Sequence, residues 1–141
     1  MYRYGAKSSD RLSTCHPALD RVFRLALEIS PYDITIIHGY RGQELQDSLL
    51  DAGLSKLAFP KSKHNATDRF GQPCSEAVDF APWVNGGIDW NDTLIFSVVA
   101  GVLFAAASEH DIELRWGGDW DGDGSSRDQS FMDLGHIEII L

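Results

Sequence analysis

The segment Glu76-Ala77-Val78-Asp79-Phe80-Ala81 carries the strongest fold signal in the sequence. Apolar and polar residues alternate in Val78-Asp79-Phe80, and Pro82 ends the segment, which is the pattern of a β-strand. Successive side chains on a strand point to opposite faces, so Val78 and Phe80 are expected on one face and Asp79 on the other. The sequence therefore predicts a carboxylate on the face opposite an apolar pair.

A second strand of this kind is expected at residues 136–140. The run His136-Ile137-Glu138-Ile139-Ile140 alternates between polar and apolar residues as far as Ile140. His136 and Glu138 then share one face of the strand. Asp79 and His136 can therefore face one cleft.

The remaining elements are predicted from helical spacing, β-rich runs and turn residues. A helix is expected from Ser13, capped by Thr14, and further elements are expected at 34–38 (strand), 43–51 (helix ending before Gly53), 91 or 92 to about 110 (helix) and 112–116 (strand). Residues 55–75 and 117–130 are rich in turn-forming residues and are expected to be loops. We predict an α+β fold in which a small antiparallel sheet holds Asp79 and His136 and helices cover its other face.

Composition limits the class of protein. The chain has 141 residues, 43% of them hydrophobic, which suits a single domain over residues 1–141. Its formal net charge of −9 repels phosphate backbones and anionic membrane surfaces, so no nucleic acid partner is expected. The most apolar stretch, residues 94–107, is shorter than the roughly 20 residues that a membrane-spanning helix needs. This stretch is expected in the core, without membrane insertion.

The cysteines and the first residues indicate the cellular compartment. Cys15 and Cys74 are too few for a disulfide framework and are expected to be reduced thiols. The start of the sequence has charged residues but no following apolar run, so no secretory signal is recognised. Synthesis in a cytoplasm is therefore expected.

Three residues form a candidate metal site, namely His64, Asp79 and His136. Imidazole and carboxylate groups are ligands for a borderline metal such as zinc. Taken singly, each residue is more often a surface or hydrogen-bonded side chain than a ligand. Their placement on strands and loops that can share one cleft favours the metal site.

Several short motifs resemble those of the zinc peptidase family of D-Ala-D-Ala carboxypeptidases and L-alanyl-D-glutamate endopeptidases. The motifs are Ser62-Lys63-His64, Ala77-Val78-Asp79, Asp133-Leu134-Gly135-His136, and Gly39-Tyr40-Arg41 followed by Gln46. The resemblance covers residues 11–141 and is closest to the single-domain phage endolysins. It implies a fold like that of Hedgehog and the D-Ala-D-Ala peptidases, with zinc held by His64, Asp79 and His136.

One spacing departs from the family pattern. The first histidine and the aspartate are often seven residues apart in the family, whereas His64 and Asp79 are fifteen apart. An insertion of about eight residues within 65–76 reconciles the two, because a longer loop costs little additional closure entropy. The glycine usual between the ligands is then displaced, with Gly71 as its counterpart.

The resemblance also implies roles for residues around the metal. Asp133 matches the general base, Arg41 the arginine that holds a substrate carboxylate or the developing oxyanion, and Ser62 a residue that orders the site. Glu138 can orient a ligand such as His136 from behind. The alternatives are that Asp133 is a turn aspartate, that Arg41 is a surface arginine, that Ser62 is an ordinary loop serine and that Glu138 is solvated. His16, His38 and His110 lack partner spacing and are expected to be structural.

An acidic run suggests a second cation. Asp119-Trp120-Asp121-Gly122-Asp123-Gly124 has the alternating carboxylates and sixth-position glycine of a calcium loop, with Asp128 as a further candidate ligand. Ser130 replaces the glutamate that an EF-hand places twelfth, so any site is irregular. Phage endolysins of the family have a similar loop linked to calcium. The alternative is a solvated turn.

The expected function is that of a phage endolysin, a monomeric zinc metallopeptidase that acts on peptidoglycan stem peptides in the host cell wall after release through a membrane lesion. An L-alanyl-D-glutamate endopeptidase is the leading interpretation. A D-Ala-D-Ala carboxypeptidase shares the zinc machinery and remains open. Two non-enzymatic alternatives are a wall-binding module with structural zinc and a calcium-responsive interaction domain.

Overall fold

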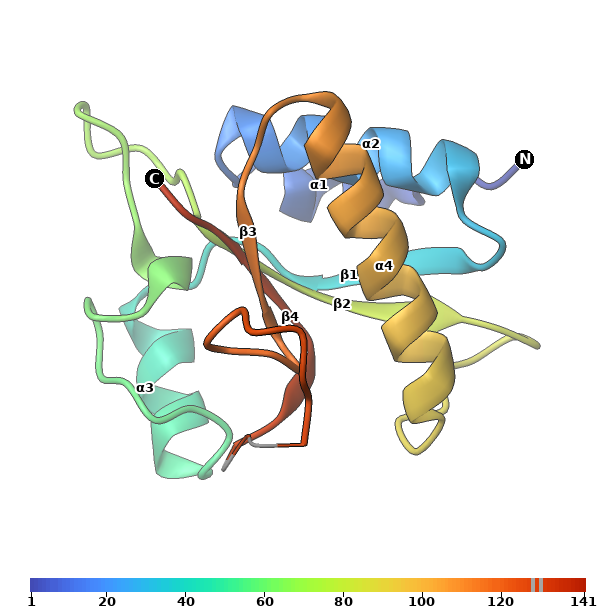
Figure 1. The fold of residues 1–141 in the computed structure, drawn as a ribbon. Coiled ribbons are helices and arrows are strands. Elements are labelled where there is room, and N and C mark those ends of the chain that lie inside the picture. Colours follow the sequence, from blue (N-terminus) through green and yellow to red (C-terminus); the bar gives the residue numbers. More distant parts are fainter. Residues whose placement is uncertain (128, 130) are drawn as a thin grey trace.

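A four-stranded antiparallel sheet forms the centre of the computed structural model, which describes residues 1–127, 129 and 131–141 (Figure 1). The strands lie in the order β1, β2, β4, β3, with bounds Asp33–His38 (β1), Ala77–Trp83 (β2), Asp133–Ile139 (β4) and Leu114–Gly117 (β3). The predicted α+β fold is confirmed. Because β2 and β4 are neighbours, Asp79 lies directly opposite His136.

Helices α1 (Ala6–Leu12), α2 (Pro17–Ile29) and α4 (Thr93–Glu109) share one core with the sheet. Strand residues Val78 and Phe80 point into this core, as the alternation predicts. Helix α4 begins at the cap Asp92, whose Oδ1 accepts a hydrogen bond from the Ile95 N–H at 3.3 Å. Its apolar run is partly buried in the core, and no helix in the described part of the chain is long and apolar enough to cross a membrane.

The N-terminal helices differ from the prediction. Helix α2 begins at Pro17, four residues later than expected, because proline fits the first helical position and His16 caps the helix. The His16 Nδ1 accepts a hydrogen bond from the Ala18 N–H at 3.0 Å. The short helix α1 was not predicted, since its seven residues carry too little apolar periodicity.

Helix α3 (Gln43–Asp51) stands apart from the other three helices (Figure 1). It ends as predicted before Gly53, which has φ of +74°, a conformation that glycine adopts without strain. The core cluster contains no residue of α3. The prediction that helices cover one face of the sheet therefore applies to α1, α2 and α4.

Strand β4 begins three residues earlier than the alternating pattern indicates, at Asp133. Asp133 pairs with Gly117 of β3, where a Cβ on the glycine would overlap the Asp133 backbone oxygen. Pairing with β2 begins only at His136, although a Cβ at Gly135 would already lie 2.6 Å from the backbone oxygen of Phe80. Asp133 is therefore part of the sheet, which begins before the residue at which the alternating pattern starts.

Candidate metal centre

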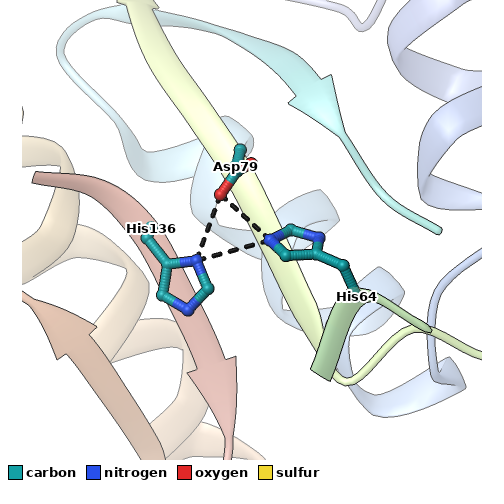
Figure 2. Close-up of side chains that lie close together, drawn as sticks. All are labelled: His64, Asp79 and His136. Atoms are coloured by element: carbon teal, nitrogen blue, oxygen red, sulfur yellow. Dashed lines mark hydrogen bonds and ion pairs between the residues drawn. The ribbon is translucent and has the colours of Figure 1, made fainter. Parts of the chain in front are cut away.

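The side chains of His64, Asp79 and His136 point toward one another (Figure 2). Asp79 Oδ1 lies 3.1 Å from His136 Nδ1 and 3.1 Å from His64 Nε2. The two histidine nitrogens are 3.4 Å apart. Strand pairing supplies Asp79 and His136, and a separate segment supplies His64.

A capped turn holds His64 in place. His64 lies in the 3-10 turn η1 (Lys63–Asn65), and its backbone N–H donates to Ser62 Oγ at 3.2 Å. The Ser62 N–H donates in turn to Asn65 Oδ1 at 3.0 Å, which completes a capping box. The predicted ordering role of Ser62 thus has a geometric basis in this turn.

The extra residues between His64 and Asp79 form a loop whose two ends are joined by backbone hydrogen bonds. The Cys74 N–H donates to the Ala66 carbonyl at 3.0 Å, and the Glu76 N–H donates to the Lys63 carbonyl at 3.0 Å. Gly71, with φ of +79°, lies in the turn between them. His64 and Asp79 therefore come into contact although fifteen residues separate them in the sequence.

Hydrogen bonds fix which nitrogen of each histidine faces the centre. His64 Nδ1 lies 2.8 Å from the Gly39 carbonyl oxygen, which can only accept, so Nδ1 carries a proton. His136 Nε2 lies 2.9 Å from Glu138 Oε1 and donates to that carboxylate. This leaves His64 Nε2 and His136 Nδ1 as the atoms available to a metal.

The carboxylates favour a cation between these atoms, and burial opposes positive charge there. Burial lowers the pKa of His64, with Asp79 opposing this effect. Burial acts to lower the pKa of His136 as well, but hydrogen bonds with Asp79 and Glu138 raise it to about 9. Burial raises the pKa of Asp79, yet the charge of His64 and hydrogen bonds from His136, His38 and His64 hold it well below its usual range. The carboxylates thus concentrate negative charge where the two histidine nitrogens meet.

The donor set fits a zinc ion. In a tetrahedral site with bonds of roughly 2.0–2.1 Å, neighbouring ligand atoms lie about 3.3–3.4 Å apart. The separations of 3.1, 3.1 and 3.4 Å are close to this value. Two imidazoles and one carboxylate also match the ligand types of catalytic zinc, which leaves a fourth position for water or substrate.

Arg41 lies behind Asp79. Its Nη2 donates to Asp79 Oδ2, and its Nη1 donates to Gln46 Oε1 at 3.4 Å. Its Nε is buried and has no hydrogen-bond partner among the described residues. The guanidinium therefore holds the Asp79 carboxylate in place from behind.

His38 was predicted to have a structural role only, but it contacts Asp79. Its Nδ1 lies 3.1 Å from Asp79 Oδ2. The contact arises because β1 pairs with β2, which places His38 opposite Asp79 beside a register shift. Its only sequence signal is its position immediately before Gly39-Tyr40-Arg41.

Asp133, Glu138 and His136 line one cleft, with a volume of about 350 Å³. Burial and the charge of Asp79 raise the pKa of Asp133. Glu138 contacts Lys63 at 3.1 Å as well as His136. Burial acts to raise the pKa of Glu138, but these partners lower it to about 2. Glu138 is consequently a paired anion and not a solvated side chain.

The acidic loop brings Asp119, Asp121 and Asp123 together with ligand atoms within 4.8 Å of one another. Asp119 Oδ2 accepts a hydrogen bond from the Gly124 N–H at 2.9 Å. Its Oδ1 is buried without a hydrogen-bond partner in the described structure. Asp128, the fourth predicted calcium ligand, lies outside the described residues.

Trp120 connects the acidic loop with the metal centre. Its ring centroid lies 5.3 Å from that of His136 and 6.1 Å from that of Phe131. The Trp120 Nε1 donates to the Phe131 carbonyl at 2.7 Å. Nothing in the sequence position of Trp120 indicates that the acidic loop folds back over His136.

Comparisons with known proteins cover nearly the whole chain. A model of the phage L-alanyl-D-glutamate peptidase family matches residues 1–140. The chain is 39% identical over 143 residues to the L-alanyl-D-glutamate peptidase of Escherichia phage T5, with coverage of 99% of this chain and 98% of the relative. Its structure matches the crystal structure of the Serratia marcescens L-Ala D-Glu endopeptidase ChiX with a TM-score of 0.76 and 27% identity, over 99% of this chain and 90% of the other. The resemblance inferred from the motifs is confirmed, and the chain belongs to the phage L-alanyl-D-glutamate peptidase family.

Proposed function

We propose that this chain is a zinc-dependent endopeptidase that hydrolyses the amide bond between L-alanine and D-glutamate in peptidoglycan stem peptides. It acts as an endolysin on the host cell wall, as a monomer with one catalytic domain over residues 1–141. Both relatives described above are named for this bond. The observation that carries the proposal is the convergence of His64 Nε2, Asp79 Oδ1 and His136 Nδ1 beside a cleft that also holds Asp133.

The chain's own residues account for the proton transfers. When bound by His64, Asp79 and His136, zinc supplies a positive charge that acidifies water and polarises an amide carbonyl. Asp133 takes a proton from the attacking water and returns it to the leaving amine. Its raised pKa suits the first of these transfers, because a more basic carboxylate takes a proton from water more readily.

Three further residues position the site. Arg41 holds Asp79 through Nη2 and also lines the cleft, where its guanidinium can donate to a substrate carboxylate or to the developing oxyanion. Ser62 caps the turn that carries His64. Glu138 orients His136 through the Nε2 hydrogen bond.

Metal content tests the ligand set. Purified wild type is expected to hold one zinc ion per chain, and His64→Ala and His136→Ala are expected to lose it. A matched control is His110→Ala, which changes an exposed histidine at the end of α4. A wild type that is fully active without metal would overturn the proposal.

Product analysis separates the endopeptidase from the carboxypeptidase. Digestion of purified stem peptides is expected to release fragments that begin with D-glutamate, which mass spectrometry identifies. Release of free D-alanine alone would instead establish the D-Ala-D-Ala carboxypeptidase. Zinc binding and wall binding without any peptide release would establish the non-catalytic module.

We further propose that the acidic loop binds calcium through Asp119, Asp121 and Asp123, with Asp128 as a further ligand. The unpartnered Asp119 Oδ1 supports this assignment, because a buried carboxylate oxygen is costly without a donor or a cation. Calcium titration followed by Trp fluorescence is expected to show saturable binding in wild type and weaker binding in Asp121→Asn. An identical response in both would remove the loop from the proposal, while calcium-dependent partner binding that ignores zinc would favour an interaction domain.

A further inference from the structure

Basic residues are concentrated in the cleft beside the metal centre. The chain has 12 Lys plus Arg against 21 Asp plus Glu. Four of those basic residues line the cleft, together with two of the acidic residues, Asp133 and Glu138; the basic four are Arg41, Lys56, Lys61 and Lys63. A strongly acidic protein thus presents a cationic wall at one place, which is suited to an anionic ligand.

Two of these lysines are not committed to a carboxylate of the protein. Lys63 Nζ pairs with Glu138 Oε2 at 3.1 Å. Lys56 Nζ instead lies over the Phe131 ring, 4.2 Å from its centroid. Among the described residues, neither Lys56 nor Lys61 forms an ion pair. Their charges are available to a molecule in the cleft.

The segment that carries Lys56 is anchored to the site. Gln46 is fully buried, and its Nε2 donates to Ser55 Oγ at 2.9 Å and to the Leu57 carbonyl at 2.6 Å. The same Gln46 accepts from Arg41 through Oε1. These bonds connect the residues on both sides of Lys56 to the arginine that holds Asp79.

A second hollow adjoins the metal centre, and no lysine lines it among the described residues. It shares Arg41, Leu54 and Asp133 with the cationic cleft, and its other lining residues include Ile37, Asp79 and Trp90. The two hollows therefore meet at Asp133. Lysines line only one of these two arms.

We propose that Lys56 and Lys61 bind the free carboxylate of the glutamate that follows the scissile bond, so that the acidic half of the substrate occupies the lysine-lined arm and the alanine side faces the arm without lysines. This inference rests on the proposed function. The bond joins a residue with a methyl side chain to one with a carboxylate, and lysines line only one of the two arms. Lys56 and Lys61 are thus specificity-determining residues and not part of the proton-transfer machinery.

The test compares two substrates in the zinc-loaded enzyme. One is an acetylated L-alanyl-D-glutamyl peptide with a free glutamate carboxylate, and the other carries a carboxamide there. Wild type is expected to show a lower KM for the carboxylate peptide. The double variant Lys56→Gln/Lys61→Gln is expected to raise that KM about tenfold, with kcat and the carboxamide KM unchanged. Lys7→Gln, an exposed lysine on α1, is the charge-matched control.

A binding measurement separates this inference from the proposed function. Calorimetry with the glutamyl peptide that lacks alanine measures its Kd without turnover, and the double variant is expected to weaken binding by the same factor. Equal KM changes on both substrates, or an unchanged Kd, would overturn the lysine assignment. Failure of wild type to cleave either peptide would overturn the proposed function alone, because the Kd comparison still decides the role of the lysines.

Discussion

Asp133 differs from the other carboxylates at the metal centre in the direction of its pKa shift. Burial and the charge of Asp79 raise the pKa of Asp133, whereas histidine contacts lower that of Asp79 and contacts with His136 and Lys63 lower that of Glu138. Two of the three carboxylates are thus fixed as anions by their partners. The third is the one suited to exchange a proton during a reaction.

Replacing Asp133 by asparagine is expected to remove activity without removing the metal. The amide keeps the shape of the side chain but cannot accept the proton, so kcat should fall by about 10²–10⁴. Peptide hydrolysis measures this loss, and elemental analysis should show wild-type zinc content. Asp10→Asn on α1 is the control. Wild-type turnover by Asp133→Asn would reject the general-base role.

The two cysteines are expected to react at different rates. Burial raises the pKa of Cys15 to about 12, and burial also raises that of the more exposed Cys74. Since the thiolate is the reactive form, alkylation at pH 8 should modify Cys74 first and speed up as the pH rises, while Cys15 should react only after unfolding. Peptide mass mapping of partly alkylated protein measures both rates. Equal rates in the folded protein would contradict the burial of Cys15.

The sequence is informative about residues that belong to short motifs. His64, Asp79 and His136 were each identified from local pattern and resemblance, and they do converge. The roles of His38 and Gly39 could not be foreseen, because their contacts arise from the pairing of β1 with β2 and from the approach of η1.

At the scale of elements, two glycines should respond oppositely to alanine. Gly135→Ala places a Cβ 2.6 Å from the Phe80 backbone oxygen and should destabilise the protein by about 1–3 kcal/mol, as overpacking does. Denaturant unfolding measures the loss. Activity should also fall, because Gly135 lies between Asp133 and His136 on β4.

Gly101→Ala is the matched substitution in α4. A Cβ at Gly101 meets nothing within 4 Å, and alanine is favoured over glycine inside a helix by roughly 0.5–1 kcal/mol. The variant should therefore unfold at higher denaturant concentration with unchanged activity. A destabilised Gly101→Ala would contradict the open surroundings of this position on α4.

The elements themselves were predictable where apolar spacing or end residues are distinctive. Helix α3 has the predicted bounds, and α4 begins directly after Asp92, one of its two predicted caps, and ends one residue before His110. Helix α1 and the early start of β4 escaped prediction for physical reasons. Helix α1 is too short to show a period, and the start of β4 depends on the pairing of Asp133 with Gly117 of β3, which the spacing within β4 does not show.

At the scale of the whole molecule, zinc should stabilise the fold, because its proposed ligands come from β2, β4 and η1. A ligand at 100 times its Kd contributes about 2.7 kcal/mol, which corresponds to roughly 8–10 °C in Tm for a chain of this size. Calorimetry of zinc-loaded and chelated protein measures the difference. His136→Ala should show none, and an unchanged wild-type Tm would argue against a shared metal.

The pairing of Asp79 with His136 across β2 and β4 bears on how preparations of this protein are assessed. A slip of one residue along β2 would turn Asp79 toward the apolar layer and carry Val78 outward. In such a molecule His64, Asp79 and His136 do not come together, whatever its secondary-structure content. In metal-saturated protein, turnover per milligram therefore reports on the fraction of chains with correct strand pairing, which spectroscopic helix and sheet content does not.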